Sequence, residues 1–236
     1  MAFLTARWES LVLLNYRCPA SLLAPLVPRG TILDTLDGEA LVSLVGFMFA
    51  DTRLLGLPVP FHRTFEEVNL RFYVRREGRE VRRAVVFVRE LVPRAAIATV
   101  ARVVYNEPYL AVPMRHDVAL APDTGGTVRY GWRHGGADFE IGATASGAAA
   151  PLVPGSEAEF ITEHYWGYTR QRDGRTLEYQ VEHPSWRVWT AERSWFTGPA
   201  GSLYGPAFAG VLAQPPRSAF IAVGSAIEVH RGRLLP

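Results

Sequence analysis

The sequence contains no lysine, and all 25 of its basic residues are arginine. A chain without lysine cannot form an imine with a carbonyl substrate, so covalent catalysis through a lysine Schiff base is excluded. A genome rich in G and C favours arginine codons and would explain arginines at the surface, but the chemical consequence is the same. Arginine stays charged at physiological pH and can bind a carboxylate through two parallel hydrogen bonds.

Cysteine is almost absent as well. Cys18 is the one cysteine, so no disulfide can form within the chain and no cysteine-based zinc site can be assembled. The six histidines lack H-x-H and H-E-x-x-H spacing, and no phosphate-binding loop or G-x-S-x-G motif occurs. We therefore expect no metal site and no cofactor, and the cysteine content fits a reducing cytoplasm.

Long apolar runs are also missing. The longest, from Leu41 to Ala50, is interrupted by Ser43 and Gly46 and is too short to cross a bilayer, and the first residues lack a signal-peptide pattern. The net charge is only +2, and the arginines are scattered among acidic residues rather than gathered in a stripe. We expect a soluble cytoplasmic protein that binds neither membranes nor nucleic acid.

The hydrophobic content predicts a folded core. With 48% hydrophobic residues the chain can bury a sizeable core, and we expect one domain over residues 1–236. Turn signals between apolar segments predict mostly antiparallel strands, and short helices complete an α+β fold. We expect strands at 8–17, 32–36, 40–50, 65–74, 84–91, 109–118, 127–134, 137–145, 177–182, 186–195 and 219–230, helices at 19–24, 94–104 and 157–165, and irregular structure at 51–63 and 198–216.

The segment Phe65–Val74, FEEVNLRFYV, carries the most informative pattern. Side chains alternate between the faces of a strand, so one face would carry a polar ladder and the other an apolar one. An exposed antiparallel strand gives the same alternation with its polar face in water. Such strands usually use Lys, Glu and Thr, however, and this face has neither Lys nor Thr, so it is suited to line a binding cavity. The polar ladder consists of Glu67, Asn69, Arg71 and Tyr73.

The same segment carries a family resemblance. The spacing F-x-E-x-N-x-R-x-Y-V, followed by a basic turn, a valine-rich strand, an Ala/Arg helix and Pro-Tyr, resembles the DUF2071 (YqjF-like) family of uncharacterised bacterial proteins. Trp8, Asp37-Gly38, the Gly56-Leu57-Pro58 loop and the segment from His164 to Ala191 extend the resemblance over most of the chain. This family is similar to the acetoacetate decarboxylase-like superfamily. The resemblance implies a β-dominated α+β fold, a barrel or cone of mostly antiparallel strands with a central cavity and a few short helices.

The resemblance does not extend to the decarboxylase chemistry. Acetoacetate decarboxylases use a lysine activated by a neighbouring cation, and in that family a helical segment with an arginine leads to Gly-x-Pro-Lys-Lys. An approximate alignment puts Arg102 on the helical segment and Tyr109 and Leu110 at the two lysine positions, after Pro108. Neither residue can form an imine. Glu67 corresponds to the acidic residue of the family.

We therefore predict a small-molecule binding protein with an arginine-lined cavity for an anionic ligand of the acidic or keto type. Two alternatives stay open. One is a lysine-independent enzyme that uses Glu67 as general acid or base. The other is a structural or partner-binding domain with a vestigial pocket, and a homo-oligomer is compatible with all three functions. The ladder itself could also be an internal Glu67–Arg71 ion pair that stiffens the barrel and binds no ligand. The predicted ligand-binding residues are Glu67, Asn69, Arg71, Tyr73, Arg102 and Tyr109.

Overall fold

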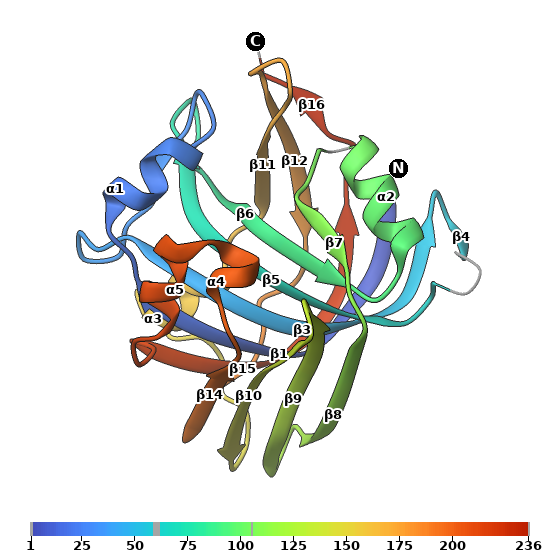
Figure 1. The fold of residues 1–236 in the computed structure, drawn as a ribbon, viewed down its shortest axis with the longest axis vertical. Coiled ribbons are helices and arrows are strands. Elements are labelled where there is room, and N and C mark those ends of the chain that lie inside the picture. The colour runs from blue at the N-terminus through green and yellow to red at the C-terminus, as the bar shows by residue number, and fades with distance from the viewer. Residues whose placement is uncertain (1, 59–61, 105, 236) are drawn as a thin grey trace.

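A computed structural model of the protein describes residues 2–58, 62–104 and 106–235, without the side chains of residues 100–104 (Figure 1). Strands dominate the described chain, and they form a sheet of 12 strands and a second sheet of 4 strands. The helices are few and short. This confirms the prediction of a β-dominated α+β fold.

The larger sheet closes on itself into a ring. Its strands pair antiparallel except where β6 contacts β11 and β7, which are both parallel to it. The path returns to its start because β12 also pairs with β15. The β6–β11 and β12–β15 ladders are each two residues long. In order around the ring the strands are β15 (Ser218–Val229), β1 (Leu4–Arg17), β3 (Leu41–Leu54), β5 (Phe65–Arg76), β6 (Arg82–Val92), β11 (Trp166–Arg170) and β12 (Thr176–Glu182).

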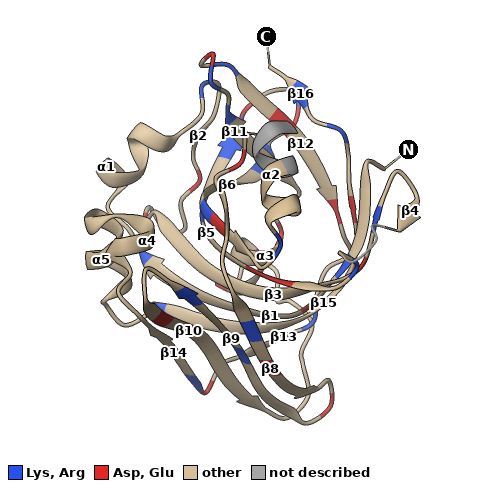
Figure 2. Ribbon diagram, turned by 45° about the vertical axis from the view of Figure 1, so that its right-hand side comes forward, with Lys and Arg blue, Asp and Glu red and all other residues tan. Residues whose placement is uncertain are grey.

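The second sheet packs against the outer face of the ring. The apolar ladder of β5, which includes Leu70 and Phe72, lies in one buried cluster with Tyr130, Trp132 and Ile141 of that sheet. The polar ladder consequently faces the inside of the ring, and Figure 2 shows basic and acidic positions close together on β5. The predicted division of β5 into two faces is therefore confirmed. The second sheet consists of β14 (Arg193–Thr197), β10 (Ala137–Ser146), β9 (Gly125–His134) and β8 (Met114–Ala121).

Two segments expected to be irregular are partly regular. Leu55 and Gly56 both have positive φ, of 51° and 81°, and this tight turn lets the end of β3 pair with β4 (Leu57–Pro58). The Gly- and Pro-rich segment after residue 198 contains two short helices, because Pro206 is at a first helical position and Gly201 and Gly205 lie at helix boundaries, although Gly210 is inside a helix. These helices are α4 (Gly201–Tyr204) and α5 (Pro206–Leu212).

The strand predicted at 109–118 is broken in two. Pro113 lacks a backbone N–H, and the chain passes there from β7 (Tyr109–Ala111) of the ring sheet to β8 of the second sheet. No helix among the described residues is long and apolar enough to span a membrane. The remaining elements are α1 (Ala20–Leu23), a 3-10 helix (Ala24–Leu26), β2 (Ile32–Leu33), α2 (Ala95–Val104), α3 (Glu157–Thr162), β13 (Val188–Thr190) and β16 (Arg233–Leu234).

Candidate functional site

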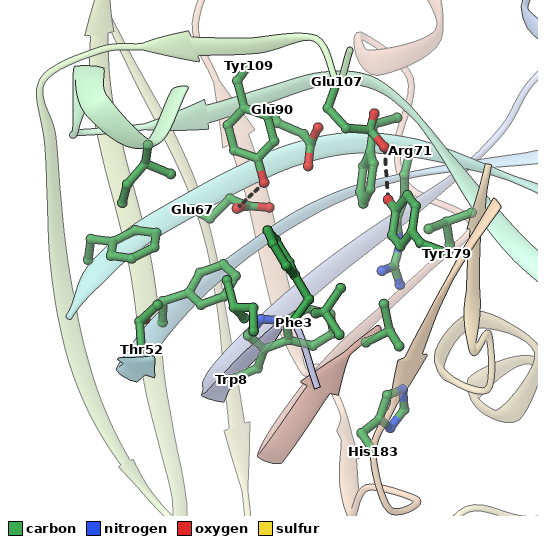
Figure 3. A pocket seen from close by; sticks show the side chains of 18 of the residues that line it. Phe3, Trp8, Thr52, Glu67, Arg71, Glu90, Glu107, Tyr109, Tyr179 and His183 are labelled. Atoms are coloured by element: carbon green, nitrogen blue, oxygen red, sulfur yellow. Dashed lines mark hydrogen bonds between the residues drawn. The ribbon is translucent and has the colours of Figure 1, made fainter. Parts of the chain in front are cut away.

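The ring encloses a cavity of about 310 Å³ (Figure 3). This is near the lower end of the roughly 300–1,000 Å³ found for small-molecule pockets. Strands of the ring, together with β7 and α2, supply its walls, and most of the lining side chains are apolar. The polar or titratable residues that line it are Thr52, His62, Glu67, Arg71, Glu90, Glu107, Tyr109, Thr162, His164, Tyr179 and His183.

Glu67 is the centre of a hydrogen-bonded group. Its Oε1 accepts a hydrogen bond from Asn69 Nδ2 at 3.1 Å, and its Oε2 accepts one from the Tyr109 hydroxyl at 3.0 Å (Figure 3). Burial raises the pKa of Glu67 to about 7, although these two hydrogen bonds and the charge of Arg71 act to lower it. Three of the predicted site residues therefore meet at one carboxyl group, which can hold or release a proton near neutral pH.

Arg71 also lines the cavity, but no carboxylate among the described residues pairs with it. Its Nη2 donates to the backbone oxygen of Ile161 at 3.2 Å, and its Nε is buried with no hydrogen-bond partner. Within the described residues, no ion pair shorter than 4 Å joins Arg71 to Glu67. The internal Glu67–Arg71 ion pair that the sequence left open is therefore not formed.

Two other predicted residues, Tyr73 and Arg102, are not among the described residues that line the cavity. Tyr73 is on the inner face of β5 but lies beneath the cavity wall, where its hydroxyl is 2.5 Å from Ser43 Oγ and its ring packs on His164. A structural hydrogen bond to Ser43 therefore occupies its hydroxyl. Arg102 is in α2, and its side chain lies outside the described residues.

Two buried acids that we did not predict complete the site. Glu90 of β6 is in register with Asn69 of β5 and with Tyr109 of β7, so three neighbouring strands bring it beside Glu67. Glu107, just before β7, accepts hydrogen bonds from Thr169 and, at 2.9 Å, from the Tyr179 hydroxyl. A signal was present for Glu90, because a single acid within an otherwise apolar strand end, E-L-V, is costly unless it has a role.

Repulsion between neighbouring acids adds to the effect of burial on the pKa values of Glu90 and Glu107. Burial raises the pKa of Glu107 to about 7 and that of Glu90 well above its usual range, and the negative charges of neighbouring acids add to both shifts. Glu90 Oε2 is buried without a hydrogen-bond partner. The cavity therefore holds acids that can be protonated near pH 7, and these can donate hydrogen bonds to a ligand or exchange protons with it.

His164 is a further residue that sequence reasoning used only as part of the family resemblance. It lines the cavity, and its Nε2 lies 3.6 Å from Asp34 Oδ2, which also receives Arg83 Nε at 2.7 Å. Burial lowers the pKa of His164 to about 4, so the ring is neutral at pH 7. Nε2 faces the Asp34 carboxylate, and Nδ1 is buried with no hydrogen-bond partner among the described residues.

Comparison with known proteins identifies the family. The profile of DUF2071, described as an uncharacterized conserved protein, matches residues 5–225. The chain belongs to this family. The protein YqjF of Bacillus subtilis, also described as uncharacterized, is 27% identical over 189 residues, which cover 78% of this chain and 74% of that protein.

Solved structures place this DUF2071 protein in the acetoacetate decarboxylase-like fold. The enduracididine biosynthesis enzyme MppR complexed with pyruvate superposes with a TM-score of 0.71 at 17% identity, over 100% of this chain and 91% of that one. An acetoacetate decarboxylase from Legionella pneumophila gives 0.65 at 14% identity, over 100% and 88%. An acetoacetate decarboxylase-like enzyme from Sphingomonas wittichii gives 0.67 at 12%, over 100% and 94%. At these identities the likeness is one of fold.

One glycine of this DUF2071 protein positions a cavity side chain. Gly167 of β11 is directly opposite Tyr179 of β12, and a Cβ on Gly167 would lie 2.2 Å from Tyr179 Cζ. The tyrosine ring therefore lies across the glycine, and this places its hydroxyl on Glu107.

Gly167→Ala is expected to lower the free energy of unfolding by about 1–3 kcal/mol, because the added methyl group must displace the Tyr179 ring. Urea denaturation measures this change. Gly210→Ala is the matched control, because Gly210 lies in α5 with no atom within 4 Å of an added Cβ, and alanine there should be neutral or stabilising by about 0.5–1 kcal/mol. Equal stability of the two variants would show that Tyr179 moves away without cost.

Proposed function

We propose that this DUF2071 protein binds a small carboxylate of the acidic or keto type inside the ring, with Arg71 as its anchor. The observation that carries the proposal is the buried guanidinium of Arg71, which lines the cavity without a carboxylate partner among the described residues. A buried charge without a counter-ion is costly, and an anionic ligand would remove that cost. The planar guanidinium also favours carboxylates because it can bind both oxygens at once.

The neighbouring groups support a ligand of the keto type. Glu90 lines the cavity, and its Oε2 is buried with no hydrogen-bond partner among the described residues, so a polar group in addition to Arg71 is available near Glu67. A protonated carboxyl group can donate a hydrogen bond to a ligand carbonyl oxygen. The fold relative MppR is a protein that binds pyruvate, which combines a carboxylate with a carbonyl group.

Catalysis is the second candidate, and the state of Glu67 favours it. A carboxyl group with a pKa of about 7, hydrogen-bonded to the Tyr109 hydroxyl, is suited to remove and return a proton at neutral pH. The substrate would be a carboxylic acid with an acidic C–H bond next to a carbonyl group. The chain has no lysine, so this chemistry would proceed without an imine.

Calorimetry and thermal denaturation with pyruvate and acetoacetate test the proposal. A bound ligand at 100 times its Kd should raise the melting temperature by about 5–10 °C, and Arg71→Gln should weaken binding by about tenfold to a hundredfold. Arg115→Gln, which changes an exposed arginine, should bind as the wild type does.

The outcomes separate the three functions. Exchange of ligand hydrogens for deuterium in D₂O, observed by NMR and lost in Glu67→Gln, indicates catalysis, whereas saturable binding without exchange indicates a carrier or sensor. Failure of both acids to bind the folded wild-type protein would contradict the proposal and favour a structural role.

A further inference from the structure

One end of the cavity is aromatic. Phe65 of β5 is in register with Phe49 of β3, which is in register with Trp8 of β1. The rings form a continuous row, with centroids 4.8 Å apart for Phe49 and Phe65 and 6.0 Å apart for Trp8 and Phe49. Trp186 extends the row at 6.2 Å from Trp8, and all four side chains line the cavity.

Arg71 and the aromatic row begin from different positions along β5. Phe65 and Arg71 are on the same face of β5, six residues apart, so their Cα atoms are separated by about 20 Å at the usual rise of a strand. In Figure 3 the labelled acids and tyrosines lie together on one side, and Phe3, Trp8 and Thr52 lie on the other. Arg71 and the row therefore line different parts of one cavity.

The charges of the lining favour a ligand with one negative charge. Arg71 is the one arginine among the described residues that line the cavity, and it shares the cavity with Glu67, Glu90 and Glu107. Among the described side chains, a second carboxylate on the ligand would meet no second guanidinium. It would instead face these acids or the aromatic row, where its desolvation is not compensated.

Two histidines of the cavity wall, His183 next to the row and His164, do not add a positive charge that could pair with a second carboxylate. His183 is stacked on Trp186 with ring centroids 4.3 Å apart, and burial lowers its pKa. His164 is neutral at pH 7, as described above.

We infer that the ligand is a monocarboxylate with an apolar tail, whose carboxylate binds Arg71 and whose tail lies against Trp8, Phe49 and Phe65. This inference rests on the proposed function and defines its substrate class. A volume of about 310 Å³ holds roughly ten non-hydrogen atoms if each takes the ~30 Å³ of a water molecule. Phenylacetate has that size, and hexanoate fits within it.

Calorimetry at pH 7.5 with acetate, butyrate, hexanoate, phenylacetate and adipate tests the inference. Each buried methylene should strengthen binding by about fourfold, so affinity should rise from acetate to hexanoate. Adipate has the length of hexanoate with a second carboxylate, and it should bind at least about tenfold more weakly than hexanoate.

Two variants test the binding of the carboxylate and the binding of the apolar tail separately. Arg71→Gln should weaken all five acids, whereas Phe65→Leu should weaken hexanoate and phenylacetate by about threefold to tenfold and leave acetate unchanged. Phe65→Leu keeps an apolar side chain, and its urea denaturation curve verifies that it is folded.

The results distinguish this inference from the proposed function. If all acids bind the wild type with similar affinity, or adipate binds as tightly as hexanoate, the proposed function stands and the apolar-tail inference is overturned. If none of the five acids binds the folded wild type, the apolar-tail inference is overturned, and the proposed function is overturned as well only if pyruvate and acetoacetate also fail to bind.

Discussion

Glu178→Ala is expected to lower the free energy of unfolding by about 3 kcal/mol, because it removes the carboxylate that pairs with three arginines. The side chain of Glu178 is completely buried. Its Oε1 lies 2.7 Å from Arg82 Nη1 and 2.7 Å from Arg233 Nη2, and its Oε2 accepts the Tyr168 hydroxyl at 2.7 Å and lies 3.4 Å from Arg76 Nη1. The arginines reach solvent, so the expected loss is at the lower end of that for broken buried ion pairs.

Chemical denaturation of Glu178→Ala beside Glu77→Ala measures this effect. Glu77 is exposed and pairs with Arg75 at 3.4 Å, and removal of such a surface pair changes stability by about 1 kcal/mol or less. Glu178→Gln keeps the size and one oxygen acceptor, so it should lie between the wild type and Glu178→Ala. A loss below about 1 kcal/mol in Glu178→Ala would show that the arginines are fully solvated without their partner.

Glu107→Gln is expected to stabilise the protein at pH 8 by about 3 kcal/mol and to have little effect near pH 4.5. The pKa of Glu107 is raised from 4.5 to about 7. Between these values the native state holds a proton that the unfolded chain releases, so the native state of the wild type loses stability as the pH rises. Glutamine carries no such proton and can still accept the hydrogen bonds of Thr169 and Tyr179.

The test compares urea denaturation of the wild type and of Glu107→Gln from pH 4.5 to pH 8. Other groups change stability in the same range: the lowered pKa of His164, about 4, removes stability as the pH falls below about 6.5. The difference between the two proteins cancels these contributions, since only residue 107 changes. Glu77→Gln should give a curve parallel to that of the wild type. A parallel curve for Glu107→Gln would contradict the raised pKa.

The strand at the centre of the site could be predicted because its pattern is local. Alternation along Phe65–Val74 determines which side chains share a face, and burial on both sides of β5 does not alter that division. Glu67 and Arg71 were therefore predicted as neighbours on one face, and both line the cavity.

The rest of the site depends on pairing between segments far apart in the sequence. Glu107 follows a helix and precedes a proline, which is typical of a turn, and only the parallel pairing of β7 with β6 brings it into the cavity. Tyr73 belongs to the polar ladder, but Ser43 of β3 takes its hydroxyl. No spacing along the chain predicts either contact.

The two-residue ladders that close the ring have a consequence for access to its interior. The β11–β12 hairpin carries Trp166 and Tyr179 of the cavity wall, and on its two sides it joins β6 and β15 through these short ladders. Local unfolding requires the fewest broken hydrogen bonds at such a place. Amide hydrogen exchange in this hairpin should therefore be faster than in β1 and β3, which share a long ladder. Local opening of this hairpin would expose the cavity to solvent while the rest of the ring stays folded, and the ion pairs of Glu178 with Arg76 and Arg82 of the β5–β6 hairpin would oppose that opening.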